Sequence, residues 1–240
     1  MATPLSRKLV IVGDGMVGKT ALLWSYVHRE FSQDYIPTVF ETTVKTVKIR
    51  SVNQSVDIGI WDTGGQEEFD QIRQFAYPGS RIILLCYAID CRTSLDNILQ
   101  TWISEINSNC PGVPIILVGC KSDKRGLPEH AKNIINSQDV LDVADQINAY
   151  AHIECSAKTG SNVVSLFEWA AEIIHQIDQS TSLKEAAGGG GQRNLNFFKN
   201  LSIRRQEKDV EVKSGRMVNS DLPRKKKNKS FLLCGLFSKD

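Results

Sequence analysis

A glycine-rich segment near the amino terminus carries the residue types that bind phosphate. It reads Gly13-x4-Gly18-Lys19-Thr20 and follows the short apolar run 8–12. Glycines at its bends let backbone N–H groups turn inward around phosphate oxygens, because no Cβ stands in the way. Lys19 can then reach the β- and γ-phosphates, and the Thr20 hydroxyl can ligate magnesium. The alternative is a turn that merely joins a strand to a helix, and the complete pattern disfavours it.

Asp62 is a second candidate for the same site, within the segment 61–66 (WDTGGQ). It ends an apolar run, and a carboxylate at the carboxyl end of a strand could hold magnesium through water. Read alone, such an aspartate is equally compatible with a turn or a helix cap. Its pairing with the phosphate loop favours the magnesium role.

Two further segments could recognise a nucleotide base. Lys121-x-Asp123 follows the apolar run 113–119, and the segment 156–158 (Ser-Ala-Lys) follows the last predicted strand. The Asp123 carboxylate can accept hydrogen bonds from N1–H and the 2-amino group of guanine, whereas N1 of adenine is an acceptor. Leaving a buried carboxylate unpaired is costly, so discrimination should be strong. The Lys121 stem can lie along the base, and 156–158 can offer a backbone N–H to the guanine oxygen. Alone, a Lys-x-Asp triplet is common on surface loops.

The elements that must hold these segments alternate along the chain. Continuous apolar runs at 81–89 and 114–119 are typical of parallel strands covered on both faces, whereas 43–50 alternates with a two-residue period. Strands alternating with helices predict an α/β, three-layer domain with a mainly parallel sheet. The predicted strands are 8–12, 43–50, 56–61, 81–89, 114–119 and 152–155, and the predicted helices are 19–28, 94–109, 138–150 and 163–177.

Composition and charge limit the class of protein, its partners and its compartment. The 240 residues are 41% hydrophobic, enough for a globular core, and their net charge of +2 hides an asymmetry. Residues 193–240 hold 13 Lys+Arg against 5 Asp+Glu, so this basic tail should meet an anionic surface, either membrane or nucleic acid. The 6 cysteines show no metal-ligand spacing and are typical of reduced thiols in a cytosolic protein. A glycine-rich linker at 186–191 and a polar stretch at 192–230 predict disorder after a domain that ends near Gln179.

In their order, these motifs resemble those of the Ras-like small GTPases, and three segments look specifically like the Rho branch. The three segments are 35–41 (YIPTVFE), 110–119 (CPGVPIILVG) and 154–159 (ECSAKT). The resemblance covers about residues 6–178. It implies a P-loop NTPase fold, the Ras-like G domain, with a six-stranded, mostly parallel sheet in an αβα arrangement. That domain would span 1–180, with a shortened Rho-type insert near 124–137, and the linker and tail would span 181–240.

The resemblance also implies roles at matching positions. Thr38 would close on magnesium and the γ-phosphate, and Gly65 would donate its N–H to that phosphate. Gln66 would orient the attacking water, Tyr35 would cover the phosphates, and Phe31 would pack against the base edge-on. These roles follow the phosphoryl-transfer mechanism of Ras.

The expected site residues fall into three groups. The catalytic residues are Lys19, Thr38, Gly65 and Gln66. The ligands of Mg²⁺ are Thr20, Thr38 and Asp62. The residues that contact GTP or GDP are Gly13, Asp14, Gly15, Met16, Val17, Gly18, Lys19, Thr20, Ala21, Phe31, Tyr35, Thr38, Gly65, Lys121, Asp123, Ser156, Ala157 and Lys158.

A GDP/GTP molecular switch in signalling is the implied function, in actin organisation, polarity or trafficking by resemblance. Segments 29–42 and 63–79 would be the two switches, through which exchange factors, GTPase-activating proteins and effectors bind. Arg29 and Arg73 are the arginines in these segments, and the resemblance gives neither the role of an arginine finger. Hydrolysis should therefore be slow alone and about 10³–10⁵-fold faster with an activating protein, for whose finger Gly15 leaves room.

Some positions depart from the family pattern. Cys120 stands where asparagine or threonine is usual, and a thiol is a weak hydrogen-bond partner, so looser tethering of the base loop and faster GDP release are expected. Gly64 replaces an alanine, and its extra backbone freedom could lower the fraction of productive Gln66 geometry. Thr42-Thr43 also differ, so effector choice does not carry over. The alternative function is a pseudo-GTPase or fast-exchanging scaffold that only holds nucleotide. Asp123 disfavours a third class, a P-loop nucleotide kinase or ATPase.

The carboxyl-terminal tail combines charge with apolar residues. Its cysteine, Cys234, stands three residues too early for a prenylation box, so prenylation is not expected. A basic run beside an apolar cluster favours contact of 224–237 with an anionic membrane, with palmitoylation of Cys234 as a further anchor. A nuclear-localisation run and a solvated tail are the alternatives. We expect a cytoplasmic monomer, peripheral on the inner face of a membrane, with no nucleic-acid partner. The basic residues are Arg224, Lys225, Lys226, Lys227 and Lys229, and the apolar ones are Phe231, Leu232, Leu233, Leu236 and Phe237.

Overall fold

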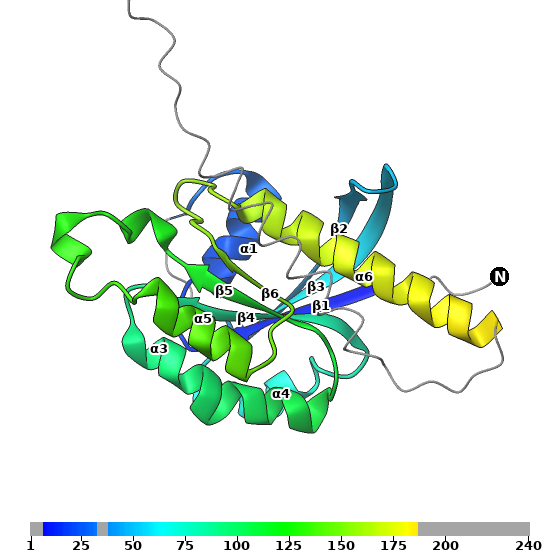
Figure 1. Ribbon diagram of the computed structural model, residues 1–240, viewed down its shortest axis with the longest axis horizontal. Helices are drawn as coiled ribbons and strands as arrows, with labels where there is room; N and C mark the ends of the chain where they lie inside the picture. Colours follow the sequence, from blue (N-terminus) through cyan, green and yellow to red (C-terminus); the bar gives the residue numbers. More distant parts are fainter. Residues whose placement is uncertain (1–6, 33–37, 187–240) are drawn as a thin grey trace, which may run out of the picture. The chain divides into compact units, whose positions relative to one another are not determined.

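Six strands form one sheet in the part of the chain that the computed structural model describes, residues 7–32 and 38–186. They follow the order β2-β3-β1-β4-β5-β6, with β2 antiparallel to β3 and the other neighbours parallel (Figure 1). The expected mostly parallel sheet of six strands is therefore confirmed. The strands are β1 (Arg7–Gly13), β2 (Phe40–Ile49), β3 (Gln54–Thr63), β4 (Ser80–Ala88), β5 (Ile115–Cys120) and β6 (Ala151–Glu154).

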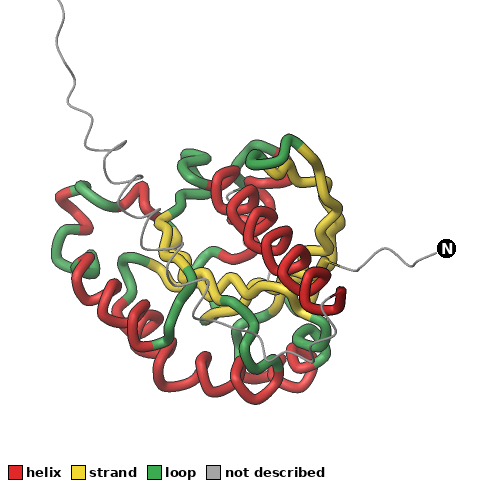
Figure 2. Tube along the Cα trace, turned by 45° about the vertical axis from the view of Figure 1, so that its right-hand side comes forward, coloured by secondary structure: helices red, strands yellow, loops and turns green. Residues whose placement is uncertain are grey.

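Helices cover both faces of the sheet. Helices α1 and α6 lie on one face, and α3, α4 and α5 lie on the other, which makes the three layers expected from the sequence (Figures 1 and 2). A π-helical segment, Ile98–Trp102, joins α3 to α4. The helices are α1 (Lys19–His28), α2 (Asp70–Gln74), α3 (Arg92–Asn97), α4 (Ile103–Asn109), α5 (Ser137–Gln146) and α6 (Val163–Ala186), with 3₁₀ turns at Glu67–Phe69, Ser122–Lys124 and Pro128–His130.

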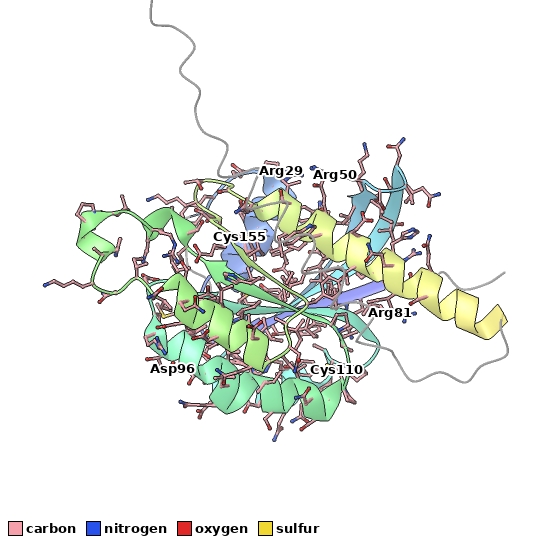
Figure 3. The ribbon with its side chains drawn as sticks, in the orientation of Figure 1. Arg29, Arg50, Arg81, Asp96, Cys110 and Cys155 are labelled. Atoms are coloured by element: carbon pink, nitrogen blue, oxygen red, sulfur yellow. The ribbon has the colours of Figure 1, made fainter. Side chains whose placement is uncertain are left out.

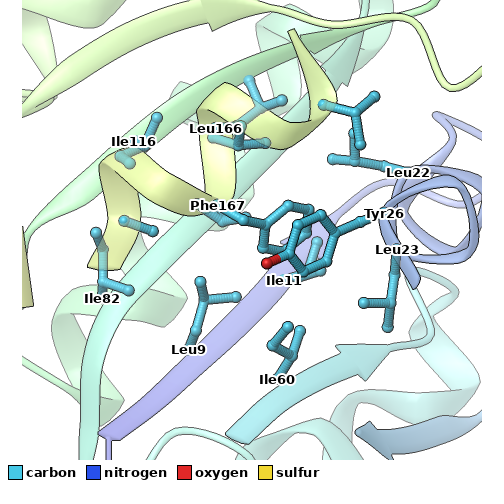
Figure 4. Packing of buried hydrophobic residues seen from close by; sticks show 14 of the residues in the cluster. Leu9, Ile11, Leu22, Leu23, Tyr26, Ile60, Ile82, Ile116, Leu166 and Phe167 are labelled. Carbon is cyan, nitrogen blue, oxygen red and sulfur yellow. The ribbon is translucent and has the colours of Figure 1, made fainter. Parts of the chain in front are cut away.

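A hydrophobic core fills each interface between sheet and helices. Alternate residues of β1 point to opposite faces, so Leu9 enters the core beneath α1 and α6 while Val10 enters the core beneath α3 to α5. In the first core, Tyr26 of α1 stacks on Phe167 of α6 with ring centroids 3.9 Å apart (Figure 4). Strands buried on both faces explain the continuous apolar runs in the sequence.

Helix α6 is also fixed to the sheet by charge. Asp178 of α6 accepts a hydrogen bond from Arg7 of β1 at 2.9 Å. It also lies 3.6 Å from the guanidinium group of Arg81 in β4, and Figure 3 shows Arg81 next to α6. The helix continues to Ala186, beyond the predicted domain end near Gln179. In the described ranges, no helix combines the length and apolarity needed to cross a bilayer.

Several helix boundaries differ from the prediction. Helix α5 ends at Gln146 rather than near Tyr150, because Asn148 adopts a left-handed φ of 52° and the chain turns toward β6. Helix α2 was not anticipated, since five residues carry too little periodicity to be recognised. The insert region near 124–137 holds a single 3₁₀ turn with Pro128 at its first position. The tail from residue 187 lies outside the described residues, as do its predicted disorder and membrane contact.

Candidate nucleotide-binding site

The predicted site segments meet at one edge of the sheet. They follow β1, β3, β5 and β6, which are parallel, so their carboxyl ends all face the same way. Register brings them together in pairs: Ile11 of β1 lies beside Asp62 of β3, and Gly119 of β5 lies beside Glu154 of β6. Ligands of open α/β sheets bind at this edge.

The phosphate loop between β1 and α1 has the backbone that its glycines predict. Gly13 has φ 137°, and a Cβ there would lie 2.2 Å from the carbonyl oxygen of Cys86; Gly18 has φ 113°. The Lys19 ammonium group is buried at the loop centre and donates to the carbonyl oxygens of Gly13 (2.7 Å) and Asp14 (2.8 Å). Burial lowers the pKa of Lys19, and the nearby Asp62 carboxylate opposes this. The first turn of α1 adds unpaired N–H groups, so the loop forms an anion site.

Two hydroxyls and a carboxylate converge beside this loop. The Thr20 hydroxyl donates to Asp62 Oδ2 at 2.6 Å and lies 2.6 Å from the hydroxyl of Thr38. The other oxygen, Asp62 Oδ1, is buried and has no hydrogen-bond partner among the described residues. Burial raises the pKa of Asp62 to about 6, although the Thr20 hydrogen bond lowers it. A cation would satisfy the unpartnered oxygen, and these hard oxygen ligands fit Mg²⁺.

The turn after β3 packs directly against the phosphate loop. A Cβ on Gly65 would lie 2.3 Å from the Gly13 carbonyl oxygen and 2.5 Å from the Gly15 nitrogen, so any side chain at 65 would force the two backbones apart. A Cβ on Gly15 would lie 3.6 Å from Cγ of Gln66. The Gln66 side chain therefore lies over the phosphate loop, and its role in orienting water stays a prediction.

Sterics, as well as backbone freedom, explain why a glycine stands at position 64. A Cβ here would lie 2.6 Å from the carbonyl oxygen of Thr38 and 2.4 Å from Cδ2 of Phe69. The Gly64 N–H donates to the carbonyl oxygen of Val39 at 3.1 Å. The absent side chain lets the segment that carries Thr38 approach the turn after β3.

The two segments predicted to recognise the base are joined by hydrogen bonds. The Ser156 hydroxyl donates to Asp123 Oδ1 at 2.6 Å, and the Ser122 N–H donates to the Cys155 carbonyl oxygen at 3.0 Å. The backbone N–H of Thr159 in turn donates to the Ser156 hydroxyl at 3.1 Å. Ser156 therefore orients the Asp123 carboxylate, a function that spacing alone did not assign to it.

Some predicted residues lie at the margin of the site or beyond the described part. Met16, Phe31 and Lys158 are exposed, and Val17 packs into the core beneath α1. Tyr35 falls in 33–37, outside the described residues. The first turn of α1 contains Ala21, which is half-buried.

The two arginines of the predicted switch segments contact other residues of the fold. Arg73 is buried and donates to the carbonyl oxygen of Gly64 at 2.8 Å and to Glu105 at 2.6 Å. Arg29 follows the carboxyl end of α1, with its guanidinium carbon 5.3 Å from the centroid of the Tyr26 ring (Figure 3). Arg73 is therefore tied to the fold rather than free to act as a finger.

Sequence reasoning missed the residues that hold Asp14. Its carboxylate accepts hydrogen bonds from Asn97 at 2.7 Å and from the Trp102 indole at 2.6 Å. Both residues lie within the predicted helix 94–109, but no motif in the sequence assigned them to the nucleotide site. Their five-residue separation matches no α-helical period, so only a prediction of the π-helical segment could have paired them.

A phosphate loop, together with the carboxylate predicted to recognise guanine at the same edge of a parallel sheet, indicates a guanine-nucleotide-binding protein of the P-loop class. Comparison with known sequences agrees: the profile of the Ras family matches residues 8–176. The GTP-binding protein Rho1 of Kluyveromyces lactis is 46% identical over 173 residues, which cover 69% of this chain and 82% of that protein. Saccharomyces cerevisiae RHO1 is 45% identical over 173 residues (69% and 82%), and Schizosaccharomyces pombe rho1 is 44% identical over 177 residues (71% and 87%).

The chain belongs to the Ras family, and its relatives place it in the Rho branch. It is a Rho-type small GTPase, an enzyme that hydrolyses GTP and works as a switch between nucleotide states.

Replacing Cys120 by asparagine is expected to slow GDP release severalfold. Cys120 is buried beneath the phosphate loop, and a Cβ on Gly18 would lie 3.5 Å from its Cβ. An amide there can hydrogen-bond the loop, whereas a thiol is a weak partner. Release of a fluorescent GDP analogue would measure the rate, with Cys120→Ala as the control that removes the thiol without adding an amide. Equal rates for Cys120→Asn and the native protein would contradict the expectation.

Proposed function

We propose that this GTPase holds Mg²⁺ with Thr20, Thr38 and Asp62 and binds the phosphates with residues 13–21. Lys19 contacts the β- and γ-phosphates, Gly65 donates its N–H to the γ-phosphate, and Asp123 recognises guanine. The observation that carries this proposal is the unpartnered, buried Asp62 Oδ1 beside two hydroxyls. When bound, Mg²⁺ neutralises charge on the β- and γ-phosphate oxygens.

Gln66 orients the water that attacks the γ-phosphate. Its side chain lies over Gly15, next to the phosphate loop, which supports this role. Arg73, the arginine of segment 63–79, is not free to act as an arginine finger, because it donates to Gly64 and Glu105. Hydrolysis therefore depends on an activating protein that inserts an arginine.

Exchange factors, activating proteins and effectors bind through segments 29–42 and 63–79, and the protein acts as a monomer. Large apolar side chains are exposed in both segments, which suits partner contacts. Val39 is 44% exposed, Ile72 41% and Phe75 77%. The pathways follow those of the Rho branch, in actin organisation, polarity or trafficking.

The experiment that tests this site is nucleotide binding and single-turnover hydrolysis by the full chain, with and without Mg²⁺ and an activating protein. We expect guanine nucleotides to outcompete adenine nucleotides, and Mg²⁺ to slow GDP release. Thr20→Ala should abolish that Mg²⁺ effect, while Thr46→Ala, which alters an exposed hydroxyl on β2, should leave it unchanged. A protein that holds GTP but does not hydrolyse it even with an activating protein would match the alternative of a nucleotide-holding scaffold.

The 224–237 tail binds an anionic membrane on the cytoplasmic side. Its basic residues contribute about 1 kcal/mol each at best, and the adjacent apolar cluster supplies a second signal. Removing the chain after Asp221 is expected to release the protein from the membrane fraction. Cys234→Ser separates lipidation from charge, since it should reduce membrane binding only if that thiol is acylated. Membrane retention of the truncated chain would contradict a tail anchor.

A further inference from the structure

Both carboxylate oxygens of one phosphate-loop residue accept hydrogen bonds from residues outside the proposed nucleotide site. Asp14 accepts from the Asn97 side-chain amide through Oδ2 at 2.7 Å and from the Trp102 indole N–H through Oδ1 at 2.6 Å. Its backbone carbonyl oxygen also accepts from Lys19 at 2.8 Å. The same residue is therefore held on one side by the phosphate-binding lysine and on the other by a helix.

The helix presents both donors because it contains a π-helical segment. Residues 97 and 102 are five apart, which in an α-helix would place them about 140° apart around the axis. At this point the N–H of Ile103 donates to the carbonyl oxygen of Ile98, the i→i+5 bond of a π-turn. The wider turn brings Asn97 and Trp102 to one side, so that they bind a single carboxylate.

The Trp102 indole also faces the second switch. The guanidinium carbon of Arg73 lies 4.6 Å from the centroid of its ring, a cation–π contact. Arg73 in turn donates to the Gly64 carbonyl oxygen at 2.8 Å, next to the glycine that packs on the phosphate loop. Glu105 of α4 also holds Arg73, with Nε–Oε1 and Nη2–Oε2 distances of 2.6 Å and 2.9 Å.

We propose that Asn97 and Trp102 are positioning residues of the nucleotide site: they hold the phosphate loop through Asp14, and Trp102 also supports Arg73 and hence the turn at Gly64. This inference rests on the phosphate loop being the nucleotide site. If the hydrogen bonds from Asn97 and Trp102 to Asp14 are weakened, the N–H groups of the loop move away from the phosphates. The nucleotide is then released faster. Hydrogen bonds to a charged group are stronger than neutral ones, and Asp14 is partly buried, so their loss has a large effect.

A charge swap in the full chain tests this hold. Asn97→Asp places two carboxylates face to face, and we expect GDP release at least about 10-fold faster than in the native protein. Adding Asp14→Asn restores both hydrogen bonds, because the new amide donates to the carboxylate introduced at position 97 and its oxygen still accepts from Trp102. Release from the double variant should return to within about 3-fold of the native rate. Gln100→Ala, an exposed change in the same π-helical segment, is the matched control and should leave release unchanged.

Two more measurements separate positioning from general stability. Trp102→Phe keeps a ring beneath Arg73 but removes the N–H donor, and it should speed release by about 3–10-fold. The ³¹P NMR resonances of bound GDP should shift in Asn97→Asp and return in the double variant. Thermal unfolding is followed in parallel, and release is measured well below every Tm.

The outcomes are distinguishable. An unchanged release rate in Asn97→Asp and Trp102→Phe, or a swap that does not restore the rate and the ³¹P resonances, would overturn the inference even if Tm falls. If Asn97→Asp does not fold, a folded double variant with native release and an altered rate in Trp102→Phe still support it. A native protein that binds no GDP would instead overturn the nucleotide site, and with it the inference.

Discussion

Replacing Asp123 by asparagine is expected to weaken GTP binding by about 10³-fold or more while improving relative binding of xanthosine triphosphate. In the proposed site the Asp123 carboxylate accepts from two donors of guanine, and a site built for a hydrogen-bond pattern rejects a mismatch by about 10⁴–10⁵-fold. Xanthine carries a carbonyl where guanine carries its amino group, so an asparagine amide can donate to it. Competition among GTP, xanthosine triphosphate and ATP would measure the change.

Two variants control this experiment. Asp142→Asn changes an exposed aspartate on α5 and should leave nucleotide preference unchanged. Ser156→Ala removes the hydroxyl that orients Asp123 and should cost about 10-fold in GTP affinity, less than the loss of the carboxylate itself. Undiminished GTP preference in folded Asp123→Asn would show that the base binds elsewhere.

Gln66→Leu is expected to lower hydrolysis stimulated by an activating protein by about 10³-fold or more, because in the proposed mechanism the attacking water loses its orienting group. GTP affinity should change little, since the Gln66 side chain lies above the loop and we propose that backbone N–H groups and Lys19 bind the phosphates. Single-turnover hydrolysis with saturating activating protein would measure the rate.

Glu67→Ala, at the exposed neighbouring position, is the matched control and should hydrolyse GTP at the native rate. If Gln66→Leu also kept the stimulated rate, the water would have to be oriented by another group. A large loss of GTP affinity instead would mean that Gln66 helps to hold the nucleotide, contrary to its assigned role.

Much of the fold could be predicted because its signals are local. The strand at 8–12, the helix at 19–28 and the buried runs at 81–89 and 114–119 each carry their own periodicity, and the structure has an element at each. Boundaries were less certain where a single residue decides them. Asn148 stops the chain from continuing α5, because its backbone is left-handed. Asparagine adopts this conformation at some positions only, so the sequence does not show where the helix ends.

The residues of the proposed site could be named from the sequence, since nucleotide chemistry restricts residue types at short spacing. Gly13, Gly18, Lys19 and Thr20 form one segment, so their proximity follows from the chain itself. Asp62 was harder, because it approaches Thr20 only through the parallel pairing of β3 with β1. The steric need for glycine at 64 appears only once the Thr38 carbonyl oxygen is known to lie beside it.

By itself, the sequence determined the α/β fold and its phosphate loop, and it predicted a carboxylate that recognises guanine. The tertiary structure decided which distant residues hold the segments of this site in place. Asn97 and Trp102 hold Asp14 across more than 80 residues, and they do so only because a π-turn rotates the two side chains to one side. Arg73 had the sequence context of a switch residue, yet its burial against Trp102 and Glu105 makes it structural. Local spacing predicts contacts within a segment, whereas contacts between distant segments depend on packing that no short pattern encodes.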